Sequence, residues 1–456
     1  RIEYGGYVFT ANKEINGLTM CAVGSGTVID YVQCSFINDD SFEWFGGKVN
    51  CSHLIAYKGT DDDFDTDFGY SGNVQFALSL RDPQLFDPTY AAASGASTSE
   101  GFESDNDANS STLTPKTKAI FSNVTIIGPY RGSLTNAVGA GGTGAGFKRA
   151  ARIRRNSELK IFNSILMDFG TGLHIDGVTT EANATNGLLK FKNNILSGYF
   201  SSKGQVGEVN SGSTFDIKTF IKNNNNDTVP LTAGILINPY ALDDNNSDFR
   251  PGTLASKGAS FTDPAFSGLV LSSYINKVNY RGAFAPAPSP MWTSGWTEYN
   301  PQTKAYGTAN VNVDGITVGT VVGSDVHITT NTTFTSNNIY LLKGAVYVDS
   351  LVTLTIEPGT VIRGDNIVAN SSLIIRRGAK LLAEGTPCNP IVFTSNKAAG
   401  SRLPGDWGGI ILLGRGSVNQ TGGVSNIEGL TIANQTQFGG GSTPNDADTS
   451  GILKYV

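Results

Sequence analysis

A repeat of about 22 residues constrains the fold of this chain more than any other feature. Short runs of alternating apolar and polar residues, bounded by Gly, Asn or Asp, return along the sequence and have the pattern of short β-strands. Phe42 and Phe64 are 22 residues apart, as are Leu54 and Phe76. Phe102 continues the alignment after an insertion. Such a period with Gly or Asn turns predicts a solenoid in which each turn of the coil is one rung.

The last third of the chain follows the same pattern in residues 354–362, 373–381, 391–394 and 409–414. Leucine-rich repeats share this period, but their Leu/Asn signature is missing, and no propeller-type blade of ~40–45 residues is found. We therefore expect an all-β chain that forms a right-handed parallel β-helix of roughly 10–13 rungs with long loop insertions. Rungs are expected over residues 1–283 and 326–456 of one solenoid. Residues 284–325, which are Pro-rich at their start and contain Trp292 and Trp296, are expected to be a linker or cap.

Composition excludes several classes of protein. The chain has 456 residues, 55 of them Gly, and only 16% are charged, so neither a helical bundle nor a disordered chain fits. The net charge of −6 argues against nucleic acid as a partner. No apolar run is long enough for a membrane span. The four Cys and three His have no zinc-site spacing, and we expect Cys21, Cys34 and Cys51 to be buried or to form one local bridge.

An acidic ladder is the sharpest local signal. With Phe42, Phe64 and Phe102 in register, the residues after them would stack on rungs about 4.8 Å apart. Like charges at that spacing repel, so their pKa values rise or a cation lies among them, and Ca²⁺ suits such an oxygen-rich cluster. The alternative is a solvated acidic face paired with Lys48, Lys58 and Arg81. The candidate metal ligands are Asp39, Asp40, Glu43, Asp61, Asp62, Asp63, Asp65, Asp67, Glu103, Asp105 and Asp107.

A basic run at residues 148–155 follows the acids. In a strand, Arg152 and Arg154 lie on one face, where they can bind sulfate or uronate groups of a glycan or neutralise the acidic ladder. No residue pattern identifies a nucleophile or a general base, and His53 and His174 are expected to be packed side chains. A catalytic role is therefore not the first expectation.

Four motifs carry a resemblance to a family. They are NDDSFEWFGG at residues 38–47, DDDFDTD at 61–67, TIEPGT at 355–360 and GDWGG at 405–409. Together they resemble a largely uncharacterised group of secreted bacterial right-handed β-helix proteins. The resemblance covers most of the chain and implies export to an extracellular or cell-surface location. It implies no particular reaction.

The order of these motifs is reversed relative to that family, in which the TIEPGT-type rungs come first. In family terms, residues 326–456 form the first part of the domain and residues 1–283 the second, with the family-like ends inside 284–325. The final LKYV and the initial RIEY would join into one alternating strand, so Val456 and Arg1 form an assembly junction. The chain is expected to be one period of a tandem protein, to cross a subunit boundary in a polymer, to be a permutant, or to be a re-ordered monomer.

Two functions follow from these features. The first is a non-catalytic extracellular structural or adhesive protein whose partner is itself, because the open ends of a β-helix can stack end to end into a fibre or array. The second is a secreted Ca²⁺-dependent protein that binds or cleaves polysaccharides, with glycans as partners. A junction within one chain would direct attention to the acidic side.

Overall fold

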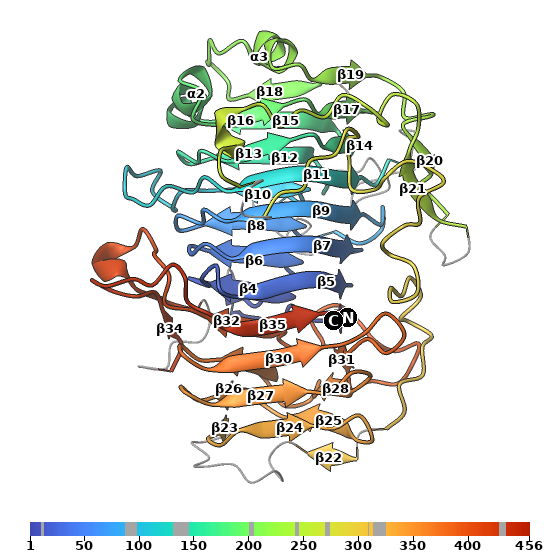
Figure 1. The fold of residues 1–456 in the computed structure, drawn as a ribbon, viewed down its shortest axis with the longest axis vertical. Helices are drawn as coiled ribbons and strands as arrows, with labels where there is room; N and C mark the ends of the chain where they lie inside the picture. Colours follow the sequence, from blue (N-terminus) through green and yellow to red (C-terminus); the bar gives the residue numbers. More distant parts are fainter. Residues whose placement is uncertain are drawn as a thin grey trace.

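Two long parallel sheets run side by side along the molecule in the computed structural model (Figure 1). The structure describes residues 1–10, 13–86, 98–130, 146–199, 205–241, 246–269, 274–308, 310–312, 325–427 and 435–456. Successive rungs pair in parallel, which confirms the expected all-β parallel β-helix. The eleven-stranded sheet contributes one strand to each of eleven rungs, within the expected range.

From the lower to the upper end in Figure 1, the strands of the eleven-stranded sheet are β23 (Val326–Ile328), β26 (Ala345–Val348), β29 (Ser372–Ile375), β32 (Ile410–Leu413), β4 (Leu18–Cys21), β6 (Phe42–Phe45), β8 (Phe64–Asp67), β10 (Phe102–Ser104), β12 (Arg149–Arg154), β15 (Thr171–Asp176) and β18 (Gly207–Val209).

The eighteen-stranded sheet bends around the other sides of the coil. Its strands are β22 (Val311–Asn312), β24 (Thr332–Phe334), β25 (Ile339–Leu342), β27 (Thr353–Ile356), β28 (Val361–Gly364), β30 (Lys380–Glu384), β31 (Val392–Ser395), β35 (Gly451–Lys454), β1 (Ile2–Glu3), β5 (Val28–Ser35), β7 (Asn50–Tyr57), β9 (Asn73–Leu80), β11 (Ile120–Ile127), β13 (Lys160–Phe162), β14 (Ile165–Met167), β16 (Lys190–Lys192), β17 (Ile195–Ser197) and β19 (Asp227–Val229).

Aromatic side chains stack through the core in the predicted register. Phe64 pairs with Phe42 on one neighbouring rung and with Phe102 on the other, and the ring centroids lie 5.9 Å and 5.4 Å apart. All three rings are fully buried. The inward position therefore repeats an aromatic residue on three rungs, and the residue after it points outward. Cys21, Cys34 and Cys51 are buried and are not joined by a disulfide bond, as the first of the two expectations for them predicts.

The upper end is covered by a helix. The helix α3 (Ile217–Asn223) lies over β18, and Ile217 and Ile221 are buried against it. A Cβ on Gly207 would clash with both side chains, so glycine permits this close approach. The helix α2 (Val178–Thr185) lies beside β15. No helix in the described residues is both long and apolar enough to span a membrane.

After the last rung the chain returns along the outside. Residues 236–306, which we call the strap, run from the upper end toward β22 beside the rungs (Figure 1). The strap contains the hairpin β20 (Leu236–Asn238) and β21 (Asp248–Pro251). Its Phe249, Phe284 and Trp296 are buried against outward apolar side chains of the rungs. The Oη atom of Tyr57 donates to the carbonyl of Tyr299 at 2.8 Å.

The strap differs from the expected domain boundaries. Residues 236–283 were expected to form rungs, but the last rung strand is β19. Isolated apolar residues between Pro, Gly and Asn lack the two-residue alternation of a rung and pack instead on the outer face. The two remaining hairpin sheets are also peripheral: β2 (Val8–Thr10) with β3 (Lys13–Glu14), and β33 (Ser425–Asn426) with β34 (Gln437–Phe438).

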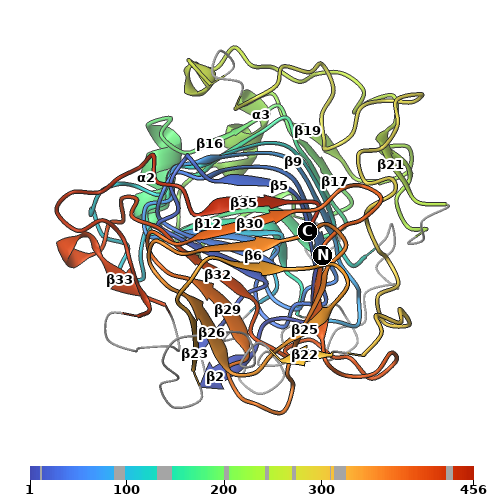
Figure 2. The same ribbon diagram turned by 60° about the horizontal axis from the view of Figure 1, so that its bottom comes forward.

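The first and last residues meet in the middle of the solenoid (Figures 1 and 2). Ile452 to Lys454 of β35 pair with Val28 to Asp30 of β5, and Ile2 and Glu3 of β1 pair with Cys34 and Ser35 of the same strand. The register of β35 opposite β5 continues without a shift into that of β1. Val456 therefore lies opposite Val32, and Arg1 lies opposite Gln33. The two half-strands of one chain thus complete a single rung.

The hydrogen bonds at this junction alternate as they do within one strand. The Val456 nitrogen donates to the Tyr31 carbonyl at 3.1 Å, and the Val456 carbonyl accepts from Gln33 at 2.8 Å. Arg1 faces the opposite neighbour, where its carbonyl accepts from the Phe393 nitrogen at 2.7 Å. Consecutive residues of a strand between parallel neighbours bond to opposite sides in this way.

Candidate functional site

At one register position, the outward face of the eleven-stranded sheet carries a titratable residue on six successive rungs. The parallel register aligns these residues from rung to rung, because each comes directly after a residue that faces the interior of the coil. We call this row the charged column; it consists of Glu43, Asp65, Glu103, Arg152, His174 and Glu208. Its lower half is acidic and its upper half mixes both signs.

A second row of side chains lies at the turn that precedes this sheet. Asn16 Oδ1 accepts from the Asp40 nitrogen at 3.2 Å, and Asp40 Oδ1 accepts from the Asp62 nitrogen at 2.9 Å. Asp62 Oδ1 in turn accepts from the Glu100 nitrogen at 2.5 Å, and Glu100 Oε2 from the Arg149 nitrogen at 2.7 Å. This turn ladder, made of Asn16, Asp40, Asp62 and Glu100, satisfies buried N–H groups of four successive turns.

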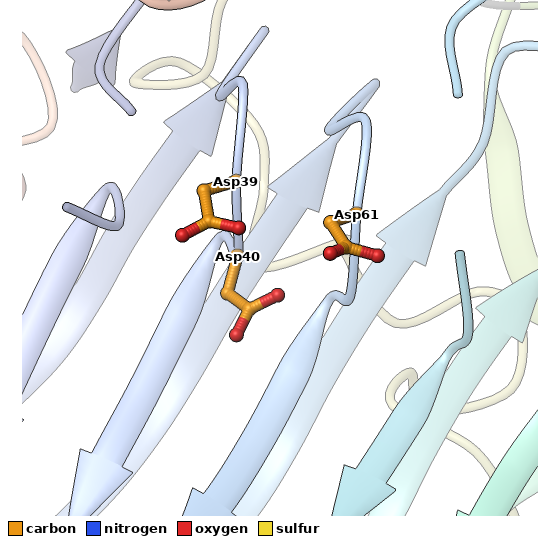
Figure 3. A group of neighbouring side chains, drawn as sticks. All are labelled: Asp39, Asp40 and Asp61. Atoms are coloured by element: carbon orange, nitrogen blue, oxygen red, sulfur yellow. The ribbon is translucent and has the colours of Figure 1, made fainter. Parts of the chain in front are cut away.

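Five carboxylates converge where the turn ladder meets the charged column. Oxygens of Asp39, Asp40 and Asp61 all lie within 4.8 Å of one another, and Figure 3 shows these side chains on two adjacent turns. Oxygens of Asp40, Glu43 and Asp65 form a second such group. Asp40 belongs to both groups. We call these five residues the acidic cluster.

The electrostatics of the acidic cluster favour a cation. Burial raises the pKa of Asp40 well above its ordinary value, and Asp39, Asp62, Asp65 and Glu43 raise it further. Burial likewise raises the pKa of Asp65, with added repulsion from Glu103 and only partial relief from Arg154. A divalent ion among these oxygens would remove the repulsion.

The donor set fits a hard cation. Asp65 Oδ1 is buried and has no hydrogen-bond partner among the described residues. Ca²⁺ takes six to eight oxygens in a flexible geometry, which carboxylates on adjacent turns can supply in part. Asp39, Asp40, Glu43, Asp61 and Asp65 are therefore the residues that would hold such an ion.

The basic run neutralises the upper acids. Arg152 contacts Glu103 at 3.4 Å and Asp176 at 2.7 Å. Arg154 also pairs with Glu103 and lies 2.7 Å from Asp105. Burial raises the pKa of Glu103 to about 7 even though Arg154 and Arg152 oppose this shift. Both arginine side chains keep some exposure, at 23% and 18%, so each retains a surface that a ligand can reach.

The remaining acids that the sequence predicted as ligands lie outside the acidic cluster. Asp63 is fully buried in an ion pair with Arg81 at 2.9 Å. Asp67 accepts from the Phe68 nitrogen, and Asp107 accepts from the nitrogens of Asn109 and Ser111 within its own loop. Asp62 belongs to the turn ladder, and Asp105 to the arginine pairs.

Asn16 and Glu100, two members of the turn ladder, were not identified from the sequence. Asn16 starts the turn ladder and also donates to Glu43. Its position 24 residues before Asp40, close to one repeat, is a signal that an alignment of turns would find. Arg81 was expected to pair with the predicted acids, and it pairs with one of them, Asp63, although this pair is buried rather than solvated. His53 stacks between Tyr31 and Phe76, as expected for a packed side chain.

A comparison with protein-family models identifies the architecture. The model described as a pectate-lyase-like β-helix domain matches residues 1–235 and 326–456. The chain belongs to this family. The match leaves out residues 236–325, which include the strap. No curated protein and no solved structure matches the chain. Membership in the family fits a role that is either polysaccharide-related or structural.

Proposed function

We propose that this member of the pectate-lyase-like β-helix family is an extracellular protein that binds an acidic polysaccharide through a Ca²⁺ ion. The observation that carries the proposal is the convergence of the acidic cluster, in which Asp40 is shared between two groups of three carboxylates. The buried, unpartnered Oδ1 atom of Asp65 supports an ion there. An ion held by exposed edges of this cluster can also accept a carboxylate of a uronic acid.

The arginines of the charged column extend the same surface. Arg152 lies one rung above Glu103 and retains partial exposure beside Arg154. A polysaccharide that runs along the column would meet the ion first and the guanidinium groups about two rungs later. The proposal is one of binding. Cleavage of the polymer is the alternative within the same class.

Binding to polygalacturonate tests the proposal. The metal-free protein is titrated with the polymer in the presence of Ca²⁺ and again with a chelator. The chelator is expected to abolish binding at the charged column. Asp40→Asn should weaken Ca²⁺-dependent binding at least tenfold, whereas Glu384→Gln, an exposed acid on another face, should not change it. Equal Ca²⁺-dependent binding by the Asp40→Asn variant would rule out the acidic cluster as the ion site.

Self-association is a second proposed role, and it concerns the lower end. The strand β23 is the last strand of the eleven-stranded sheet among the described residues. The upper end is covered by α3, so this role is limited to contacts at the lower end rather than a head-to-tail stack. Sedimentation over a wide concentration range measures it. A strictly monomeric protein at all concentrations would remove this role.

The reversed order of the family motifs is also part of the proposal. We infer that β35 and β1 correspond to the two halves of one rung strand in a secreted bacterial relative. The continuous register of these strands opposite β5 supports this inference. On this inference, the junction of Val456 and Arg1 lies within one molecule.

A further inference from the structure

A groove in the strap lies outside the residues that the family model matches. It has a volume of about 630 Å³ and is lined by parts of two stretches, 259–262 and 277–280. The two stretches come together where the Ala259 nitrogen donates to the Asn279 carbonyl. The groove and the charged column lie on different sheets of the solenoid, because the groove is anchored to the eighteen-stranded sheet.

Amide side chains of the rungs hold the groove in place. Gln75 makes two hydrogen bonds of 2.8 Å to the backbone of Asn276, one to its carbonyl and one from its nitrogen. Asn163 makes the same pair of bonds to Ser260, at 3.1 Å and 2.8 Å. Asn123 donates to the Tyr280 carbonyl at 2.9 Å. Both walls are thus fixed to the rungs before any ligand arrives, which lowers the entropic cost of binding.

The lining combines aromatic rings with polar tips. Phe261 and Tyr280 are half-buried, and each ring is supported from behind, Phe261 by Phe266 at 5.0 Å and Tyr280 by Phe76 at 6.5 Å. Thr262, Lys277 and Asn279 are exposed around them. A pyranose ring presents apolar C–H faces and a rim of hydroxyl groups. Aromatic rings beside hydroxyl, amide and ammonium groups complement both features.

Lysines make this part of the surface positive. Lys160 of β13 pairs in register with Lys190 of β16 on the neighbouring rung, and Lys192 lies two residues further along β16. Asp263, which follows the groove residue Thr262, pairs with Lys190 and Lys192 at 2.5 Å and 2.9 Å. One carboxylate therefore pairs with two ammonium groups, and Lys277 adds a positive charge in the lining of the groove itself. An anionic ligand is favoured over a neutral one.

We propose that this groove binds one sugar of an acidic glycan, with the ring against Phe261 and Tyr280 and its carboxylate near Lys277. The inference goes beyond the proposed function, because it concerns a separate site that needs no metal ion. It assigns a binding role to the segment of this chain that the family model does not match. A glycan bound at both sites would be held by two faces of the solenoid.

The test is a titration of the whole chain in the presence of a chelator, so that the acidic cluster does not contribute. The probes are an oligogalacturonate and a galacto-oligosaccharide of equal length. We expect the acidic probe to bind several-fold more tightly. Phe261→Ala should weaken binding of both probes about tenfold, whereas Phe261→Trp, which keeps a ring, should retain it. Lys277→Gln should remove the preference for the acidic probe.

Three outcomes would overturn the inference. These are no binding of either probe, binding that Phe261→Ala and Lys277→Gln both leave unchanged, or an equal affinity for the two probes in the unaltered protein. Lys277 is exposed, so its substitution tests the charge without a risk to folding. Glu384→Gln serves as the matched surface control. Failure here leaves the Ca²⁺-dependent binding at the charged column as a separate result.

Discussion

Asp40 accepts a hydrogen bond from the backbone nitrogen of Asp62 on the next turn, at 2.9 Å, and its carboxylate is also shared by both groups of the acidic cluster. The Asp40 side chain therefore has two roles that substitutions can separate. As an acceptor it satisfies a buried N–H group, and as an anion it contributes to the proposed ion site. An asparagine at this position still accepts the hydrogen bond but carries no negative charge.

Substitutions of Asp40 should separate its role as a hydrogen-bond acceptor from its role as an anion. Asp40→Ala leaves the Asp62 N–H group buried without an acceptor and should lower the free energy of unfolding by about 1–3 kcal/mol. Asp40→Asn should cost less than about 1 kcal/mol without metal, because the amide oxygen still accepts. Urea unfolding of the metal-free protein measures both. An asparagine variant as unstable as the alanine variant would show that the charge, not the acceptor, is required.

The core aromatic stack should be sensitive to cavities. Phe64 is fully buried between Phe42 and Phe102. Phe64→Ala should lower the free energy of unfolding by about 3–5 kcal/mol, and Phe64→Leu by much less, since leucine refills most of the volume. Chemical denaturation provides the comparison. Similar small losses for both variants would contradict the stacked register.

Sequence reasoning anticipated this part of the fold well. The spacing of Phe42, Phe64 and Phe102 predicts both the inward stack and the outward acids, because strand alternation and a fixed repeat leave little freedom. The strap was predicted only in part, because residues 284–325 were expected to be a linker or cap but residues 236–283 were expected to form rungs. Residues such as Phe249 and Trp296 have no period, and tertiary packing on the outer face decides where they lie.

The sequence predicted where the acidic cluster lies, but it did not predict which of the acidic residues belong to it. Register places Glu43 and Asp65 together, yet it does not reveal that Asp63 turns inward to Arg81 or that Asp107 remains in its own loop. Those outcomes depend on side-chain direction and on partners far away in sequence. Asn16 was missed because a single Asn before a strand has no local signature.

Docking of the strap should weaken in acid. Burial alone would raise the pKa of Asp263, but hydrogen bonds from Lys190, the Ala265 nitrogen and Lys192 outweigh it and lower the pKa to about 2. The carboxylate therefore adds stability above its unfolded value near 4, and this stability is lost as the pH falls from about 4 to 2. At pH 7 Asp263→Asn should cost about 1–2 kcal/mol.

The pH dependence supplies the control for this substitution. Below pH 2 the unaltered protein and the Asp263→Asn variant should have the same unfolding free energy, because the carboxyl is then protonated in both the folded and unfolded states. Urea unfolding at several pH values gives the difference curve. A difference that does not change between pH 7 and pH 2 would show that the lost contact is not ionic.

The junction of Val456 and Arg1 should accept a covalent bond. Arg1 and Val456 are buried at adjacent register positions opposite β5, so a peptide bond between them fits the strand. A permutant that joins Val456 to Arg1 and opens the chain after Thr308 should keep the β-sheet circular dichroism and gain about 1–3 kcal/mol of stability. Insertion of one extra residue at the join reverses the faces of the strand and should destabilise it. Equal stability of the two permutants would contradict the continuous register.

Calorimetric titration of the metal-free protein with Ca²⁺ tests the central claim most directly. We predict saturable binding that Asp40→Asn abolishes or weakens at least tenfold, while Glu384→Gln binds as the unaltered protein does. The absence of binding to the unaltered protein, or identical binding by the Asp40→Asn variant, would contradict the assignment of an ion to the acidic cluster.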